Sequence, residues 1–507
     1  MTASPVAPSD LHVWENSRLP VNRLPQEILI HIVIYVTAAD PSGYEMLIRL
    51  THVCTQWRQV IVACPAFWTH IRFGGGYMTD SLANLFFERA KQCALDVHIS
   101  FLLSLRKWRK RRSLIPKVLA IPKLSPGQWI RSFSIDQGHP TWAKVQELVG
   151  GWADALSLAQ ELVLLVDEGN PPPSTPAVFV GKALKNLRLE GFAVPGLDYI
   201  KAPNLTVLEL EDYSRAPLSV VALLDFFDAT PSLEDVSICS SRVHEFPPLN
   251  RKVTLSHLQR VTLSVDHSPQ VASYLICPSI TNTWLSEVLP DDPSASAFFP
   301  ELPWLLGQYS VEVINDVRMQ VFDLDGSQSC CLQIRDPSGA TLRASRQASQ
   351  EPDPFPPFAD EIWPFPILFD QVVSTLLSLP LDHVTAFSAD LQEASEFAVD
   401  PDQIRGRLAE VFEKCLDLQE VVLENYSPGH FPDISGKKMP AIRALVIKHP
   451  GNVSWEELVE NVTEAARARH SRGAPLERIE IFTKEEQPRI EELESLVREV
   501  EYRVLDR

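Results

Sequence analysis

The chain has 507 residues, of which 45% are hydrophobic and 22% are charged, and its formal net charge is -19. This length exceeds one ordinary core, so we expect several packed units or one extended repeat array, and the composition excludes a wholly disordered chain. The negative charge disfavours nonspecific attraction to nucleic acid or anionic lipid. Membrane association and nucleic-acid binding are therefore not expected.

The N-terminal residues and the cysteines predict a soluble intracellular protein, in the cytoplasm or the nucleus. Residues 1–22 are expected to be a disordered tail and lack the basic start and apolar run of a secretory signal. The apolar run at 28–36 is far shorter than the roughly 20 residues that a membrane-spanning helix needs. The eight cysteines form no disulfide framework and no CxxC pair, so we interpret them as free thiols.

Short helices are predicted between residues 23 and 73. The first begins after Pro25, where proline costs no helical hydrogen bond, and the segment TAADPSGY at 37–44 ends it. A later helix ends before Pro65. Its apolar residues recur at spacings of three, four and seven. They are Leu50, Val53, Cys54, Trp57, Val60, Ile61 and Cys64.

The cysteines of this helix, flanked by His52 and His70, raise the alternative of a metal site. On one helix Cys54 and Cys64 would be separated by about 15 Å of rise, whereas ligands of one zinc ion lie within a few ångströms of each other. Packing is therefore favoured, and no metal or cofactor is expected. So small a module is predicted to complete its burial against a partner.

Residues 23–73 resemble an F-box. The shared features are a leucine-proline-x-glutamate start in LPQEILIHIVIYV, the core VCTQWR and a closing phenylalanine-tryptophan pair. The resemblance implies docking onto a Skp-type adaptor and, through it, onto a cullin. The matching positions are Leu24, Pro25, Glu27, Ile28, Ile32, Val53, Cys54, Trp57 and Arg58. The alternative for each is packing within the module's own core.

Two later segments share one pattern. LLDFFDATPSLEDVSI at 223–238 and LAEVFEKCLDLQEVVL at 408–423 align without gaps. In each, apolar residues at helical spacing lead through a short break into an alternating apolar pattern. Each segment therefore predicts a helix-turn-strand unit.

Further strands of the form leucine-x-x-apolar-x-apolar, or close to it, are predicted along the chain. They are LKNLRL at 184, LTVLEL at 205, LQRVTL at 258, LDHVTA at 381, IRALVI at 442 and LERIEI at 476. The early spacings are in or near the range of leucine-rich repeats, whose stacking buries a continuous core and leaves a binding surface. Unit lengths are irregular, so we expect an irregular α/β solenoid, which resembles the degenerate leucine-rich arrays of fungal F-box proteins.

The array is expected over residues 74–267 and 381–483. The proline-rich region 268–380 between them is interpreted either as an inserted lobe or as very irregular repeats. Two strands joined at Asp325 and Gly326 are predicted within it. A calcium loop is disfavoured there because Leu332 stands where a bidentate glutamate is required. Residues 336–360 are alternatively a flexible linker.

The C-terminal sequence predicts two helices. WEELVENVTEAARARH at 455–470 has one apolar face, and residues 484–507 carry a stripe at three-four spacing that predicts a helix capping the array. Self-association through this stripe is the alternative. The basic run RKWRKRR at 106–112 is read as a solvated loop, with a localisation signal and nucleic-acid contact as alternatives.

The combined prediction is a non-catalytic substrate-recognition subunit of a Skp/cullin/F-box ubiquitin ligase, which binds a protein target on its array. The acidic balance favours a target with a basic surface. The alternative is a leucine-rich interaction scaffold without ligase association. A hydrolase in the 268–380 region would require a pocket that gathers His267, His383 and carboxylates.

Overall fold

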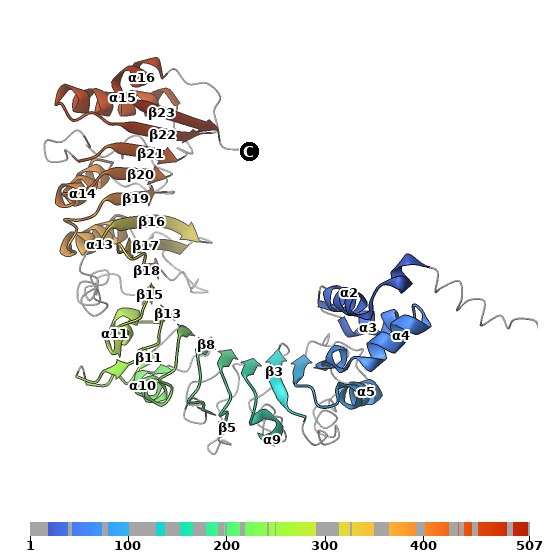
Figure 1. Ribbon diagram of the computed structural model, residues 1–507. Coiled ribbons are helices and arrows are strands. Elements are labelled where there is room, and N and C mark those ends of the chain that lie inside the picture. Colours follow the sequence, from blue (N-terminus) through green and yellow to red (C-terminus); the bar gives the residue numbers. More distant parts are fainter. Residues whose placement is uncertain are drawn as a thin grey trace, which may run out of the picture. The chain divides into compact units, whose positions relative to one another are not determined.

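The computed structural model describes residues 19–38, 43–73, 80–100, 128–136, 153–165, 179–190, 197, 200–212, 218–240, 243–248, 250–289, 314–324, 327–348, 365–391, 401–424, 434, 441–448, 455–483 and 490–504 (Figure 1). The basic run 106–112 and most of the proline-rich text at 351–366 lie outside these residues. The chain divides into two compact units, Met1–Leu205 and Thr206–Arg507, and each is described by itself.

The first unit begins with a module of short helices. They are η1 (Pro20–Arg23), α2 (Gln26–Ala38), α3 (Gly43–Thr51), α4 (Thr55–Ala63) and η2 (Pro65–Trp68). Residues 20–22, predicted to belong to a disordered tail, are part of this module. The helices α2 and α3 also include Thr37 and Tyr44, so the break between them is shorter than the sequence suggested.

The helix predicted from Leu50 to Cys64 is interrupted, and this prediction was wrong. The helix α3 ends at Thr51, and Cys54 has an extended backbone with φ -158° and ψ 174° before α4 begins. The Nε of Arg58 donates a hydrogen bond to the carbonyl of Thr51 at 2.9 Å, which satisfies a carbonyl at the end of α3. The apolar stripe is therefore shared between two helices.

A parallel sheet follows the module in the first unit. Its strands pair in the order β1 (His70–Phe73), β2 (Leu95–Ser100), β3 (Ile130–Asp136), β4 (Glu161–Leu165) and β6 (Asn186–Glu190). Helix α5 (Asp80–Ala90) joins β1 to β2, a short helix α9 (Ala153–Leu156) precedes β4, and β5 (Phe179–Val180) pairs with β7 (Ile200–Lys201). Every second residue is buried along β1, β2, β4 and β6, which is the pattern of a sheet with one covered face, and β3 follows it after a register shift at Arg131.

The second unit contains a longer sheet. Its strands pair in the order β8 (Val207–Asp212), β10 (Asp235–Ser240), β13 (Arg260–Ser264), β15 (Asn282–Leu289), β18 (Thr341–Ala348), β17 (Ser327–Arg335), β16 (Asp316–Leu324), β19 (Ala386–Leu391), β20 (Glu420–Glu424), β21 (Ala444–Lys448), β22 (Arg478–Thr483) and β23 (Glu499–Val504). All pairs are parallel except the two that β17 makes. Two short parallel pairs flank it, β9 (Leu218–Ser219) with β11 (Val243–His244) and β12 (Val253–Thr254) with β14 (Leu275–Ile276).

Helices cover one face of this sheet (Figure 1). They are α10 (Val220–Ala229), α11 (Ser268–Ser273), α13 (Phe365–Ser378), α14 (Pro401–Lys414), α15 (Trp455–Ser471) and α16 (Glu491–Leu496). The two aligned segments each form a helix followed by a strand, α10 with β10 and α14 with β20, as predicted. The ring of Phe412 on α14 packs edge to face against Phe387 on β19, with centroids 5.1 Å apart. Helix and sheet therefore share one apolar core.

Strands of the 268–380 region are part of the sheet. The predicted pair of strands around residues 325 and 326 is confirmed, because Leu324 pairs with Ser327 in an antiparallel register. Strand β18 also pairs with β15, and strand β16 also pairs with β19. The described strands of this region therefore lie in the same sheet as the parallel strands before and after them. The part of the 336–360 segment up to Ala348 is a turn and a strand rather than a linker.

The C-terminal segment is a short helix and a strand, and the prediction of one capping helix over 484–507 was wrong. After α16, the backbone of Val497 is extended, and β23 pairs in parallel with β22. Val500 and Val504 are four residues apart, a spacing that fits a helix and an alternating strand equally well. The intervening Tyr502 favours the strand, because aromatic and β-branched residues pack well on a pleated surface.

Arg469 on α15 is a buried arginine that binds backbone carbonyls outside its own helix. Its side chain is 2% exposed and its terminal nitrogens donate to the carbonyls of Ile434 at 3.0 Å and Ile442 at 2.7 Å. Burial lowers the pKa of Arg469 from its ordinary value. We expect Arg469→Met to reduce the free energy of unfolding by about 1–3 kcal/mol, because two buried carbonyls lose their donor.

The measurement is urea denaturation of the full chain followed by circular dichroism. The control is Arg467→Met on the same helix, where an exposed guanidinium pairs with Glu492. Solvent screens this pair, so the midpoint of the control is expected to stay that of the wild type. Equal midpoints for both variants and the wild type would contradict the role of Arg469.

Candidate functional site

A buried hydrogen bond joins η1, at the start of the N-terminal module, to α4. Trp57 on α4 is 7% exposed, and its Nε1 donates to Oδ1 of Asn22 at 2.9 Å. The thiol of Cys54 donates to the same oxygen at 3.6 Å. Asn22 is itself 7% exposed, so its amide provides the partner that a buried indole N–H needs. Asn22 was missed by sequence reasoning, since nothing in a lone asparagine indicates burial.

A second tryptophan joins the module to the sheet. Trp68 is 1% exposed, and its Nε1 donates to the carbonyl of Ile61 at 2.9 Å. Its ring packs edge to face against Phe86 on α5 at 4.9 Å, and the guanidinium of Arg89 lies 4.4 Å from the ring centroid. The module is therefore anchored to α5, the first helix of the α/β region, and does not depend on an external partner at this end.

The nine positions predicted to bind an adaptor separate into three groups. Exposed residues are Pro25, Glu27, Ile28, Val53 and Arg58; partly exposed residues are Leu24, Ile32 and Cys54; Trp57 is buried. Ile28 is 45% and Val53 is 54% exposed, which is high for aliphatic residues. Trp57 instead packs in the module's own core, the alternative that the sequence left open.

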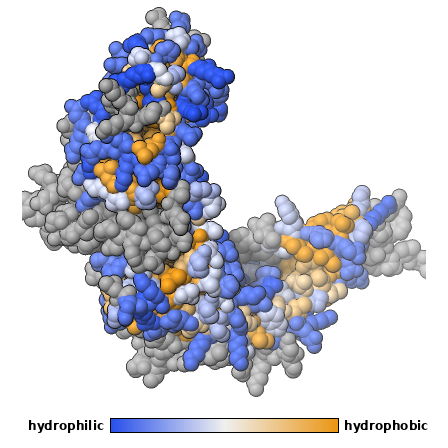
Figure 2. All heavy atoms as spheres, turned by 60° about the vertical axis from the view of Figure 1, so that its left-hand side comes forward, coloured by the Kyte–Doolittle hydropathy of each residue, from blue (hydrophilic) through white to orange (hydrophobic). Residues whose placement is uncertain are grey.

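Helix α2 presents an exposed apolar stripe. Leu29 and Val33 point into the core, while Ile28, Ile32 and Tyr35 follow one another at spacings of four and three on the outer side. Tyr35 is 79% exposed, and sequence reasoning missed it together with Leu19, Val21, Ile34 and Val62, which are 37% to 49% exposed. Apolar residues gather on the surface of this N-terminal module, at the right of Figure 2. Exposed patches of this kind mark interaction sites.

The missed residues carry a signal that could have been found. The run from Ile28 to Val36 is apolar at almost every position, more than one core-facing stripe requires. A helix that is apolar on both faces and too short to span a membrane needs a second partner.

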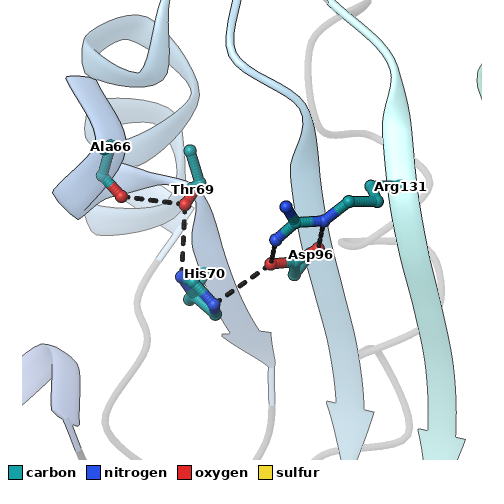
Figure 3. A network of polar contacts seen from close by, with 5 residues as sticks. All are labelled: Ala66, Thr69, His70, Asp96 and Arg131. Atoms are coloured by element: carbon teal, nitrogen blue, oxygen red, sulfur yellow. Dashed lines mark hydrogen bonds and ion pairs between the residues drawn. The ribbon is translucent and has the colours of Figure 1, made fainter. Parts of the chain in front are cut away.

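A polar network fixes the junction between the module and the first strands (Figure 3). The hydroxyl of Thr69 donates to the carbonyl of Ala66 at 2.9 Å and lies 3.2 Å from Nδ1 of His70. Nε2 of His70 is 3.0 Å from Asp96, and both carboxylate oxygens of Asp96 accept from Arg131 at 2.9 and 2.5 Å. The hydrogen bond to Asp96 raises the pKa of Arg131 above its ordinary value. The network thus holds β1, β2 and β3 together at their solvent side.

A cavity of about 570 Å³ lies beside this network. Its walls are mostly apolar where α2, α3 and η2 contribute, and β1, β2 and β3 contribute the polar residues His70, Asp96, His98 and Ser134. His98 and Ser134 are themselves joined at 2.6 Å. The cavity sits within the first unit, between the module and the sheet.

The residue pair on which a hydrolase would depend is not brought together. His267 packs against the ring of Phe246 beside β13, at a centroid distance of 5.8 Å, and His383 contacts Asp417 at 3.0 Å on an exposed turn before β19. The strands β15, β18, β17 and β16 lie between β13 and β19, which corresponds to roughly 24 Å across the sheet. No shared pocket of these two histidines is therefore formed.

Within the described part of the chain, no cluster of three or more histidine, cysteine or acidic residues is arranged to hold a metal ion. None of the helices described is both long enough and apolar enough to cross a membrane.

The family comparison agrees with the geometry of the module. A family model described as F-box-like matches residues 21–74, a range that includes Asn22, Trp57 and Trp68. The chain thus has a helical F-box-like domain at its N-terminal side, followed by a mixed α/β region with a large sheet. Such a domain suggests an F-box adaptor role, and F-box domains commonly bind Skp-type adaptors. No curated protein matches the chain.

The hydrogen bond between Asn22 and Trp57 can be tested directly. Asn22→Ala leaves a buried indole N–H without its partner, which costs about 1–3 kcal/mol. Hydrogen exchange of the α4 amides, measured by mass spectrometry on the full chain, is expected to accelerate about tenfold or more. Gln59→Ala, at an exposed position of the same helix, is expected to leave exchange unchanged. Unchanged exchange in Asn22→Ala would show that the bond does not close the module.

Proposed function

We propose that the protein is the substrate-recognition subunit of a Skp/cullin/F-box ubiquitin ligase. The observation that carries this proposal is an F-box-like domain whose core is closed internally while α2 keeps Ile28, Ile32 and Tyr35 toward solvent. An adaptor that covers this stripe would remove apolar area from water, at about 25 cal/mol for each Å² buried. The proposed site comprises the exposed and partly exposed members of the predicted set together with Tyr35.

The mechanism is proximity. The adaptor and the cullin would hold this chain near a charged ubiquitin-conjugating enzyme, and the α/β region would hold the target. Fixing both partners raises the effective concentration of a target lysine, so the chain itself performs no covalent step. An intracellular location, in the cytoplasm or the nucleus, follows from this role.

The target would bind to the α/β region. We interpret its helix-strand units as irregular leucine-rich repeats of the kind found in fungal F-box proteins. Support comes from the parallel register of neighbouring strands and from the helices on one face, which leave the other face to solvent. A surface built from many strands presents side chains at fixed spacings, which suits the recognition of a protein segment.

Co-purification with a recombinant Skp-type adaptor tests the proposal. We expect the wild type to capture the adaptor and Ile28→Ser with Tyr35→Ser to lose at least about tenfold in affinity, because two apolar anchors are removed. The matched control is Leu416→Ser, which changes an exposed aliphatic residue of the second unit that is 62% exposed. Hydrogen exchange of α4 confirms that the double variant is folded.

The outcomes separate the two functions that the sequence left open. Capture that the double variant does not weaken would overturn the assignment of the α2 stripe. A wild type that fails to capture the adaptor would favour an interaction scaffold without ligase association.

A further inference from the structure

The solvent face of the second-unit sheet is organised in rows across the strands. One row runs through Thr262, Trp284, Arg343, Gln333 and Arg318, which are direct neighbours in the registers of β13, β15, β18, β17 and β16. Their sequence neighbours point to the helix side and are buried. The row therefore belongs to the face that the helices leave uncovered.

Trp284 is an exposed aromatic residue in the middle of this face. Its side chain is 41% exposed, although it lies on an interior strand of a large sheet. The guanidinium of Arg343 lies 4.6 Å from its ring centroid, and the indole Nε1 donates to the hydroxyl of Ser345 at 3.3 Å. These contacts fix the ring before any ligand arrives. Tryptophan and arginine are the residue types that dominate binding energies at protein interfaces.

The charge of Arg343 lacks a carboxylate partner among the described residues. Its Nε donates to the sulfur of Cys331 at 3.0 Å. Burial raises the pKa of the Cys331 thiol, so at neutral pH the sulfur is uncharged and does not neutralise the guanidinium. The two terminal nitrogens are therefore in a position to donate to an incoming anion.

Nearby arginines on the same face are already paired. Arg318 contacts Glu424 at 3.2 Å, Arg335 contacts Asp316 at 3.8 Å and Arg260 contacts Asp235 at 2.6 Å. One uncompensated guanidinium suits a single carboxylate, whereas recognition of a phosphorylated residue uses a cluster of arginines. The chemistry of this face thus favours a carboxylate.

Acidic residues lie on the same face, on strands beyond the two ends of this row. Glu209 is on β8, three strands from Trp284, which corresponds to about 14 Å, and Glu480 and Glu501 are on β22 and β23 at the other end. A long polyanion would be repelled by these residues. Glu480 and Glu501 each pair with an arginine on their own strand. A segment with one central carboxylate and neutral or basic flanks is therefore complementary to the row at its centre and is not repelled at its ends.

We propose that Trp284 and Arg343 bind an internal segment of a protein in which an aspartate or glutamate stands next to an aromatic or aliphatic residue. The carboxylate accepts two hydrogen bonds from the terminal nitrogens of Arg343, and the apolar side chain packs on the exposed indole. The inference rests on the proposed function in that it names the class of target segment that the α/β region holds.

The test is a selection of displayed random 12-residue peptides on the full chain without adaptor. We expect enriched peptides to carry an acidic residue within two positions of an apolar one. Synthetic copies, measured by fluorescence anisotropy, are expected to bind Trp284→Ala and Arg343→Gln at least tenfold more weakly than the wild type. Arg335→Gln, on the neighbouring strand, is the matched control and is expected to bind as the wild type does.

Three results would overturn the inference: no enriched peptide, enriched peptides without acidic residues, or binding that both variants retain. Hydrogen exchange of β15 and β18 checks that the variants are folded, and Arg343→Lys provides a charged variant without the bidentate geometry, expected to bind at an intermediate level. Failure of adaptor capture leaves this result intact, because the selection contains no adaptor. Success of adaptor capture without peptide binding would overturn only the present inference.

Discussion

No helix-strand unit of this protein can bury its own apolar side chains, and the architecture follows from that constraint. On β10, Val236 and Ile238 are fully buried, as are Leu223 and Phe227 of the preceding helix α10, and the edges of the strand are closed by β8 and β13. Stacking thus completes one face and dictates that the alternate residues face solvent. The same constraint that stabilises the fold creates the surface on which polar residues and Trp284 are displayed.

The N-terminal module buries its large side chains without stacking against identical units. It is too small to bury two tryptophans without help, so each indole N–H is satisfied inside the chain, one by Asn22 and one by the carbonyl of Ile61. Apolar side chains that the module does not bury lie on the outer side of α2. A module whose buried polar groups are satisfied internally and whose outer face is apolar can dock a partner without unfolding, as the proposed role requires.

Sequence patterns predicted the elements better than their ends. Alternating aliphatic residues identified β6, β8, β13, β20 and β22, and the hairpin between β16 and β17 followed from one turn dipeptide. The break at residues 52–54 and the strand β23 were missed, because Cys54 and Val500 fit helical spacing as well as they fit the observed structure. The burial of Asn22 depends on a contact across 35 positions to Trp57, which local patterns do not contain.

Net charge and local charge lead to different expectations about a partner. A value of -19 favours a basic target at long range, yet solvent ions screen that field beyond about 10 Å. At contact, the uncompensated guanidinium of Arg343 beside an apolar ring determines which group is bound. The two effects act at different distances and are compatible in one target: a basic surface that approaches the chain, with a single carboxylate that reaches the centre of the sheet.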